Sequence, residues 1–167
     1  MHKKQEKNTF SLIFFRKEGI YLLITREVDY ALRILRDLSD GNLHVMKELC
    51  EREMVPHKFA YKIIRKLADA KLIQATRGVG GGVRLTADLS QITLYDLLKI
   101  IDPGRHISAC TAANYQCEWR ERDKRICRMH IQLSRIERVF NTELKRNSLQ
   151  TLLFGDDLPE NSGTTMK

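Results

Sequence analysis

The spacing of apolar residues predicts three helices in the first half of the chain. Between Thr25 and Ser39 they recur at helical steps, at Val28, Ala31, Leu32, Leu35 and Leu38. Thr25 is a suitable N-cap, and Asp40-Gly41 ends the pattern. A second short helix is expected at about Val45 to Glu53. The third begins near Pro56 and places one apolar face at Phe59, Ile63, Leu67 and Ala70. The tight break between the second and third helices predicts a helix-turn-helix.

Two short β-prone segments follow, Leu72 to Thr76 and Val83 to Thr86, and a glycine-rich turn joins them. Behind a helix-turn-helix, such a hairpin is typical of a wing. A phosphate-binding loop is excluded, because no Gly-Lys-Ser/Thr follows and the turn leads into a strand. Gly80, Gly81 and Gly82 either supply positive φ angles for the turn or also let the backbone approach DNA phosphate.

The second half of the chain predicts two more helices. The fourth runs from Thr93 to Ile101, with Thr93 as cap and Asp96 in the first turn. A long helix is expected at about Lys124 to Leu149, and its apolar stripe is Met129, Leu133, Ile136, Phe140 and Leu144. A stripe of this length favours packing on a second copy, so a homodimer is predicted, while an intramolecular core helix stays an alternative.

These elements give a mainly α fold, a winged helix-turn-helix with a long C-terminal dimerisation helix. We divide the chain into an N-terminal extension at 1–19, a DNA-binding domain at 20–102, a cysteine-containing loop at 103–123, a dimerisation helix at 124–154 and a tail at 155–167. The basic extension and the polar tail are expected to be disordered.

Composition adds the expected class of partner and compartment. The 167 residues carry 29 Lys and Arg against 21 Asp and Glu, a net charge of +8 that favours an anionic partner such as nucleic acid. The apolar run Phe10 to Phe15 is too short to span a bilayer and lacks a signal peptide's cleavage site, so no membrane association and a cytoplasmic location are expected. In that reducing compartment, cysteines favour metal ligation or redox switching over disulfides.

Three cysteines and a histidine lie close together in the second half of the chain. Six residues separate Cys110 from Cys117, nine separate Cys117 from Cys127, and two separate Cys127 from His130. Structural zinc more often uses Cys-x-x-Cys pairs, which are missing, so the gaps favour an iron-sulfur cluster. Zinc, a bare thiol switch and inert cysteines remain alternatives. Cys50, in the second helix, is expected to be a small buried apolar residue.

The chain resembles the Rrf-type family of winged-helix transcription regulators, and in particular its IscR-, NsrR- and RirA-like members. The resemblance runs from about Tyr21 to Phe154 and rests on the segments Leu23 to Arg33, Phe59 to Ile73 and Arg77 to Leu85 and on the three cysteines. It implies a homodimer that inserts one recognition helix per subunit into successive major grooves of a palindromic double-stranded DNA operator.

The resemblance also implies a cofactor, a 2Fe-2S or 4Fe-4S cluster on Cys110, Cys117 and Cys127. Its fourth ligand is either His130, as in IscR-like members, or Asp29, which completes the cluster across the dimer in NsrR-like members. Cys127 and His130 stand at positions i and i+3 of one helix, so they face the same way. Asp29 has a second interpretation, as a first-turn acid that stabilises its helix.

The residues expected to bind DNA lie on the third helix and the wing. They are Lys58, Tyr61, Lys62 and Arg65 on the helix and Arg77, Gly80, Gly81 and Arg84 at the wing. Phe59, Ile63 and Leu67 are expected to hold the helix to the core. The alternative for the polar helix residues is a solvated face without a partner.

We therefore predict a transcriptional repressor that senses iron, nitric oxide or redox state through an iron-sulfur cluster. A metal-free thiol switch or a zinc-binding regulator of the same fold is the alternative. Enzymatic activity is not expected, because a zinc hydrolase or deaminase needs a general base and a motif such as His-x-Glu with Pro-Cys-x-x-Cys, and neither motif occurs.

Overall fold

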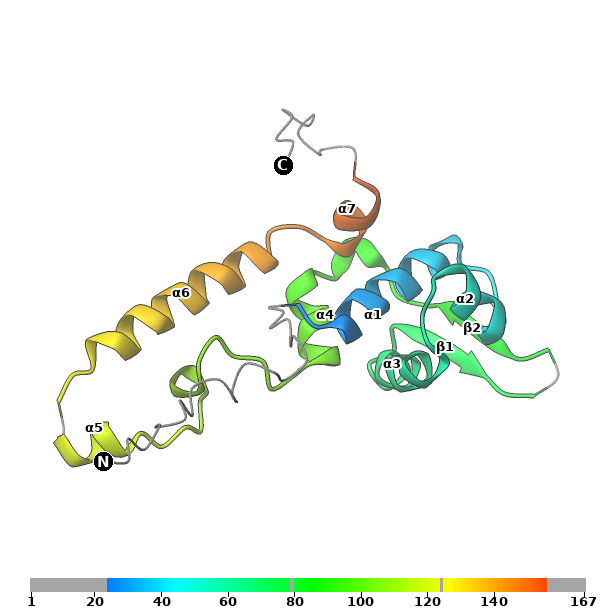
Figure 1. Cartoon of the computed structure of the whole chain (residues 1–167). Helices are drawn as coiled ribbons and strands as arrows, with labels where there is room; N and C mark the ends of the chain where they lie inside the picture. Colours follow the sequence, from blue (N-terminus) through cyan, green and yellow to red (C-terminus); the bar gives the residue numbers. More distant parts are fainter. Residues whose placement is uncertain (1–23, 79, 124, 156–167) are drawn as a thin grey trace, which may run out of the picture.

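The computed structural model describes residues 24–78, 80–123 and 125–155, and Figure 1 shows their arrangement. The predicted extension at 1–19 and the tail beyond Gly155 lie outside the described residues. The α-helices are α1 (Arg26–Asp37), α2 (Met46–Arg52), α3 (His57–Asp69), α4 (Leu94–Ile101), α5 (Glu118–Asp123), α6 (Arg128–Leu144) and α7 (Leu149–Phe154). The strands are β1 (Ile73–Thr76) and β2 (Gly82–Leu85), and the 3-10 turns are η2 (Leu38–Asp40), η3 (Leu89–Gln91) and η4 (Ala109–Thr111). The fold is mainly helical, as the sequence predicted.

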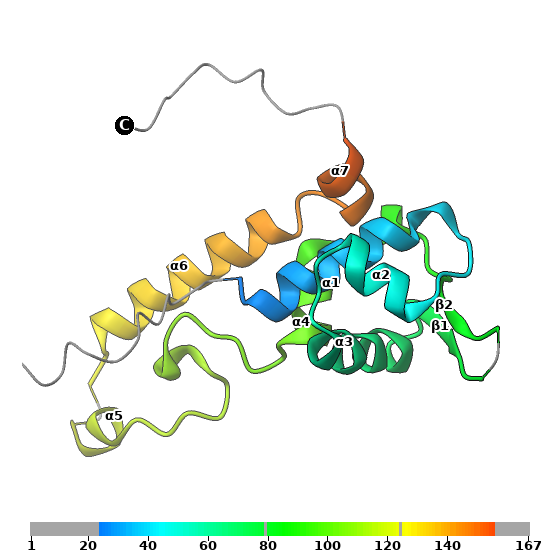
Figure 2. The ribbon, with the colours of Figure 1, turned by 45° about the vertical axis from the view of Figure 1, so that its right-hand side comes forward.

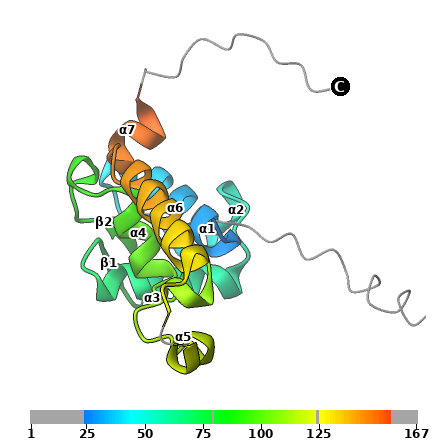
Figure 3. The same cartoon turned by 90° about the vertical axis from the view of Figure 1, so that its left-hand side faces the viewer.

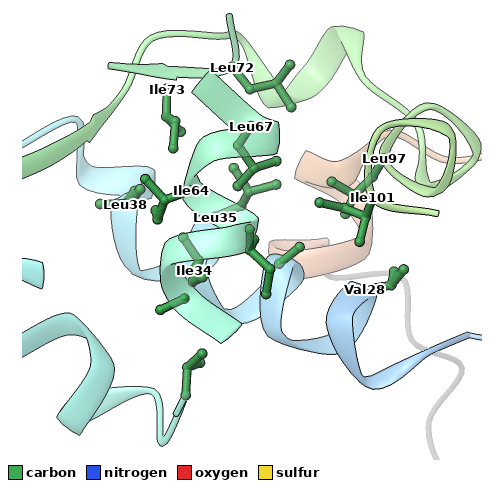
Figure 4. Close-up of a cluster of buried hydrophobic side chains, with 14 of the residues drawn as sticks. Val28, Ile34, Leu35, Leu38, Ile64, Leu67, Leu72, Ile73, Leu97 and Ile101 are labelled. Atoms are coloured by element: carbon green, nitrogen blue, oxygen red, sulfur yellow. The ribbon is translucent and has the colours of Figure 1, made fainter. Parts of the chain in front are cut away.

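An apolar core joins α1, α3 and α4. Figure 4 shows Leu35 and Leu67 from α1 and α3 pointing toward Ile101 of α4. Ile34 of α1, which the predicted stripe omitted, is also fully buried, whereas Leu32 is only partly buried. In the part of the chain that the structure describes, no polar or charged residue is buried. The buried interior of the domain is therefore apolar throughout.

The connection between α2 and α3 confirms the predicted helix-turn-helix. Met54 adopts a left-handed φ of 51°, which turns the chain sharply after α2. Val55 then enters the core at 2% exposure, and its N–H donates to the carbonyl of Cys50 at 3.0 Å. This turn fixes the angle at which α3 leaves the domain.

The wing is a β-hairpin that a third segment supports. β1 and β2 pair antiparallel, and His44 forms backbone hydrogen bonds of 2.8 and 2.9 Å with Val83 on the other edge of β2. Only part of the glycine interpretation is correct, because Gly80 has a φ of 78° but Gly81 and Gly82 have no positive φ. A Cβ on Gly82 would lie 2.5 Å from the carbonyl oxygen of His44, so this position requires glycine for close packing.

Two predicted helix caps have different outcomes. The Thr93 side chain accepts a hydrogen bond from the N–H of Asp96, and the Asp96 carboxylate accepts one from the N–H of Thr93, so α4 begins with a capping box. Thr25 occupies the N-cap position of α1, but its side chain makes no capping hydrogen bond. Its hydroxyl is buried without a partner among the described residues.

The long C-terminal helix is shorter than predicted. Instead of running from about 124 to 149, α6 has 17 residues and is followed by α7, which the Ser148 side chain caps. α7 anchors this end, since Leu149 is fully buried and its N–H donates to the carbonyl of Ile92 at 2.6 Å. The opposite end of α6 extends away from the winged domain, toward α5 (Figures 1 and 3).

The predicted stripe on α6 is divided between two environments. Leu144 is 8% exposed and Phe140 packs against the core, so the C-terminal part of the stripe lies on the chain's own domain. Met129, Ile136 and the neighbouring Val139 are 67%, 54% and 65% exposed. The C-terminal part of α6 therefore packs as an intramolecular core helix. The middle of the helix is uncovered and is the part that a second copy could cover.

The close packing of Gly82 gives a stability prediction. Gly82→Ala is expected to lower the free energy of unfolding by roughly 1–3 kcal/mol, because the methyl group meets the backbone of His44, which cannot move aside without breaking the bridge to Val83. Urea unfolding measures this value. Gly104→Ala is the control, since a Cβ there meets open space, and its stability should change by less than about 1 kcal/mol. Equal stabilities of the two variants would contradict the explanation.

Candidate DNA-binding surface and cysteine-lined hollow

The face of α3 that points away from the core carries the four predicted DNA-binding residues. Lys58, Tyr61, Lys62 and Arg65 are all exposed, Tyr61 at 62% and the Arg65 side chain at 86%. The opposite face is buried and consists of Ala60, Ile63, Ile64 and Leu67. The prediction for Phe59 was wrong: it is 37% exposed and lies at the edge of the core, with its ring 5.6 Å from that of Tyr30.

Two of the four α3 residues form ion pairs within the chain, Lys62 with α1 and Arg65 with its own helix. Lys62 Nζ donates to the Glu27 carboxylate of α1 at 2.5 Å, and Lys66 Nζ donates to the same carboxylate at 3.1 Å. The hydrogen bond from Lys62 is the largest cause that lowers the pKa of Glu27. The sequence did not predict this role of Glu27, because no sequence pattern relates two residues that are 35 positions apart. Lys62 is thus partly neutralised. Arg65 Nε lies 3.9 Å from Asp69 Oδ2 on the same helix, but the two side chains are 86% and 75% exposed, so solvent screens this pair more strongly. Arg65 and Lys58 therefore keep more of their charge for a ligand.

The wing places two more cations next to this face. Figure 2 shows the hairpin projecting at the end of the molecule opposite α5, beyond α3. Arg77 is exposed in the turn after β1. Arg84 is also exposed, but its guanidinium donates to Gln74 Oε1 across the hairpin at 2.9 and 2.6 Å, which holds it in place. Gly80 is exposed and Gly81 half-buried in the turn between the strands.

The structure brings three of the predicted cluster ligands to one hollow. Cys117, Cys127 and His130 line a hollow of about 650 Å³, together with Arg120 and Arg125. Cys127 is the N-cap of α6, and its sulfur accepts a hydrogen bond of 3.5 Å from the N–H of His130. Cys117 directly precedes α5, and Cys127 and His130 lie at the start of α6. Residues from these two helices line the hollow.

His130 provides a test of whether this hollow suits a metal group. Its Nδ1 is buried and has no hydrogen-bond partner within the described residues. A buried polar atom without a partner is costly, and a metal bond would satisfy it. Thiolate sulfur and imidazole nitrogen are ligands that suit iron-sulfur clusters and zinc. Cys117, Cys127 and His130 therefore fit such a group in the chemistry of their donor atoms, and they line the same hollow.

The two remaining predicted ligands lie elsewhere in the chain. Cys110 is in η4, where its sulfur is 3.4 Å from the Ser108 hydroxyl oxygen. Asp29 is on α1, paired with Arg33 at 3.0 Å, and it lines a separate hollow formed with α4 and α7. Across residues 24–78, 80–123 and 125–155, no three His, Cys, Asp or Glu side chains are close enough together to hold a metal ion. The full predicted ligand set is thus not assembled within one chain.

Cys50 behaves as predicted for a core residue. It is 4% exposed in α2, and burial raises the pKa of its thiol. A thiol whose ionised form is disfavoured is a poor ligand and a poor nucleophile. Cys50 therefore separates in character from the three partly exposed cysteines of the second half.

No helix in the described part of the chain is both long and apolar enough to cross a membrane.

Two known proteins are similar to this chain over about half of its length. Protein aau3 of Rhizobium meliloti (strain 1021) is 32% identical over 92 residues, which cover 54% of this chain and 60% of the relative. The HTH-type transcriptional regulator NsrR of Bacillus subtilis (strain 168) is 29% identical over 94 residues, which cover 54% of this chain and 64% of that protein. The matches thus span less than two thirds of either relative.

Solved structures share the fold. The crystal structure of Staphylococcus aureus CymR superposes with a TM-score of 0.58 at 15% sequence identity, covering 81% of this chain and 99% of that one.

A family model covers most of the described residues. The Rrf2 model, described as an iron-dependent transcriptional regulator, matches residues 24–154. The matched region contains the whole of α3, the wing and the cysteine-lined hollow. The description is that of a regulator and not of an enzyme, in agreement with the prediction from the sequence. This chain belongs to the Rrf2 family of transcriptional regulators.

Proposed function

We propose that this protein is a homodimeric, DNA-binding transcriptional repressor that senses iron, nitric oxide or redox state through an iron-sulfur cluster. One observation carries the proposal: the family match includes both an exposed basic helix face and a hollow where two thiols meet a histidine with an unpartnered buried nitrogen. Its place of action would be the compartment that holds the DNA, which is the cytoplasm in bacteria such as Rhizobium meliloti and Bacillus subtilis.

DNA binding is supported by the arrangement of α3 and the wing. A recognition helix that follows a tight turn enters the major groove with its N-terminal residues toward base edges. Lys58 and Tyr61 lie on that part of α3, and Arg65 follows one turn later. Arg77 and the glycine turn extend the surface toward the neighbouring phosphates. Two such surfaces in a two-fold dimer match a palindromic operator.

A homodimer is supported by the uncovered apolar surface of α6. Ile136, Val139 and Phe140 line a hollow on this helix, beside Arg135 and Glu143. Exposed apolar side chains on a helix that extends from its domain are stabilised by packing on the same helix of a second copy. Charged residues at the rim of the hollow then provide opposite signs for pairing across a two-fold axis.

The cluster is supported by the donors that share one hollow. Cys117, Cys127 and His130 would hold it, and Cys110 would join them from η4. In one chain His130 is the better placed fourth ligand, whereas Asp29 requires the partner of a dimer. When bound, the cluster would supply a group that reacts with nitric oxide or oxidants or is lost when iron is scarce. Because Cys127 also caps α6, a change in its bonding would act on the first turn of that helix.

A metal-free thiol switch remains the second candidate, and a zinc site on the same residues is a further alternative. The observation that favours the metal-free switch is that no three metal-binding side chains among the described residues lie close enough together to hold a metal ion. Cys110, in η4, does not line the hollow. Cys110, Cys117 and Cys127 are partly exposed, so an oxidant in solution can reach their thiols.

The internal pairing of Lys62 gives a graded prediction for DNA binding. Arg65→Ala should lower the slope of log affinity against log salt by about one, because it removes a phosphate contact. Lys62→Ala should lower the slope less, since Glu27 already neutralises part of that charge. Fluorescence anisotropy with a duplex selected from a random library measures both. Lys99→Ala on α4 is the charge-matched control and should bind like the parent protein. An equal slope for all four proteins would overturn the proposed DNA surface.

The α6 surface predicts a dimer that one charge disrupts. Ile136→Glu should raise the dissociation constant of the dimer roughly tenfold or more, because the carboxylate would be buried without a partner. Sedimentation velocity over a concentration series reports the monomer fraction. Gln150→Glu, on the exposed face of α7, adds the same charge away from the stripe and should leave the dimer intact. A parent protein that sediments as a monomer would refute this part of the proposal.

The cysteine-lined hollow predicts a coloured protein. After anaerobic purification the parent should be brown and contain iron and sulfide, Cys117→Ala should lose the colour, and Cys50→Ala should keep it because Cys50 lies in the core. His130→Ala and Asp29→Ala identify the fourth ligand by which of them alters the visible spectrum. A colourless parent without iron or sulfide, despite expression that supports cluster assembly, would leave the thiol switch or zinc as the explanation.

A further inference from the structure

A lysine of the recognition helix lies at the junction of three helices. Lys66 Nζ, from α3, donates to Glu27 of α1 at 3.1 Å and to the backbone carbonyl of Ile101, the last residue of α4, at 2.5 Å. The side chains of Lys66 and Glu27 are 28% and 22% exposed. Because both are partly shielded, solvent and salt screen their attraction less than that of a surface pair.

The acceptor on α4 marks the point where the chain leaves the core. The last carbonyls of a helix have no partner within the helix, and a cation at that end is favourable. The Ile101 side chain is 1% exposed in the core, and the residues after it lead out to Cys110. Lys66 therefore contacts the backbone where the cysteine-bearing segment begins.

The same segment is tied on its other side to α6. Arg105 Nη2 donates to Asn141 Oδ1 at 3.3 Å, and His106 Nδ1 lies 3.1 Å from Glu137 Oε1. α6 in turn begins directly after Cys127 and carries His130, which lines the cysteine hollow. Residues 101–106 thus connect α6, with its cysteine-lined end, to the recognition helix.

We propose that Lys66, held by Glu27 and by the end of α4, is a positioning residue that adjusts α3 to the state of the cysteine-bearing segment. The inference rests on the proposed function. It identifies a relay, meaning a set of side-chain contacts that couples the cysteine-bearing segment to the recognition helix. A shift of α6 or of the segment after Ile101 moves the carbonyl that Lys66 binds, and Lys66 is on the same helix as Lys58, Tyr61 and Arg65. The recognition helix is thereby linked to the hollow through side-chain contacts as well as through the chain itself.

A purely structural ion pair makes a different prediction from a relay. A structural pair stabilises the domain equally whatever the state of the cysteines, so its loss changes DNA affinity by one factor in all states. A relay contributes to DNA affinity by different amounts in the different states of the cysteines. Its loss therefore changes the ratio of affinities between states. The ratio is therefore the quantity to measure.

The test compares DNA affinity in three states of the full-length protein. These are the protein with a reconstituted iron-sulfur cluster, the cluster-free reduced protein, and the cluster-free protein alkylated with N-ethylmaleimide. Under native conditions the alkylation falls on the partly exposed cysteines, because Cys50 is 4% exposed. Fluorescence anisotropy with the selected duplex gives a dissociation constant in each state, and the largest divided by the smallest is the coupling ratio.

Lys66→Met should lower the coupling ratio by roughly threefold or more, because methionine keeps the length of the side chain but loses both hydrogen bonds. Lys66→Arg keeps the charge and the donors and should retain most of the ratio. Arg65→Met is the matched control, since it removes the neighbouring cation of α3. It should weaken binding by the same factor in every state and leave the ratio unchanged.

A second variant covers the case that Lys66→Met does not fold, which circular dichroism would reveal. Glu27→Gln removes the anchor on α1, so it should lower the ratio and also strengthen binding in all states by freeing Lys62. If the parent affinity depends on the state but both variants keep the full ratio, the relay is overturned and the proposed function stands. A parent that binds DNA equally in all three states, or not at all, overturns the proposed function and the relay with it.

Discussion

The apolar packing of α1 against α3 and α4 positions every functional part of this protein. Leu35, Leu67 and Ile101 belong to this core, and no polar or charged residue is buried in the described part of the chain. α1 carries Asp29, α3 carries the exposed basic face, and α4 ends where the cysteine-bearing segment begins. A change in how these helices pack therefore affects the DNA-binding face and the cysteine-bearing segment together.

The net charge of +8 is not one uniform surface. Lys62 and Lys66 are paired with Glu27 inside the domain, and Arg84 is held by Gln74 across the wing. These cations set the positions of helices and strands. The Arg65 side chain is 86% exposed and lies 3.9 Å from the exposed carboxylate of Asp69, so it remains available to an anionic ligand. The fold thus separates cations that organise the DNA-binding face from those that can contact phosphate.

Different parts of α6 lie in different environments. Its C-terminal part is fixed to the winged domain through Leu144 and α7, while its middle presents Ile136 and Val139 to solvent. Its first turn begins at Cys127, whose sulfur caps the helix. A single rigid helix therefore connects the cysteine-lined hollow, the uncovered apolar surface and the DNA-binding domain. This arrangement suits the proposed regulator, whose signal would be received at the end of the molecule opposite the wing (Figure 2).

The sequence by itself determined the elements whose signals are local. Helical periodicity, the turn before Pro56 and the glycine-rich hairpin predicted the winged helix-turn-helix, and Thr93 with Asp96 predicted the cap of α4, because each pattern extends over only a few residues. Tertiary structure alone decided which faces were covered and which distant residues met. Phe59 lies at the edge of the core, and the apolar stripe of α6 is partly buried and partly exposed. Glu27 pairs with Lys62, which is 35 positions away in the sequence. The physical reason is that periodicity specifies which face of a helix is apolar, whereas the partner of that face depends on how the whole chain packs.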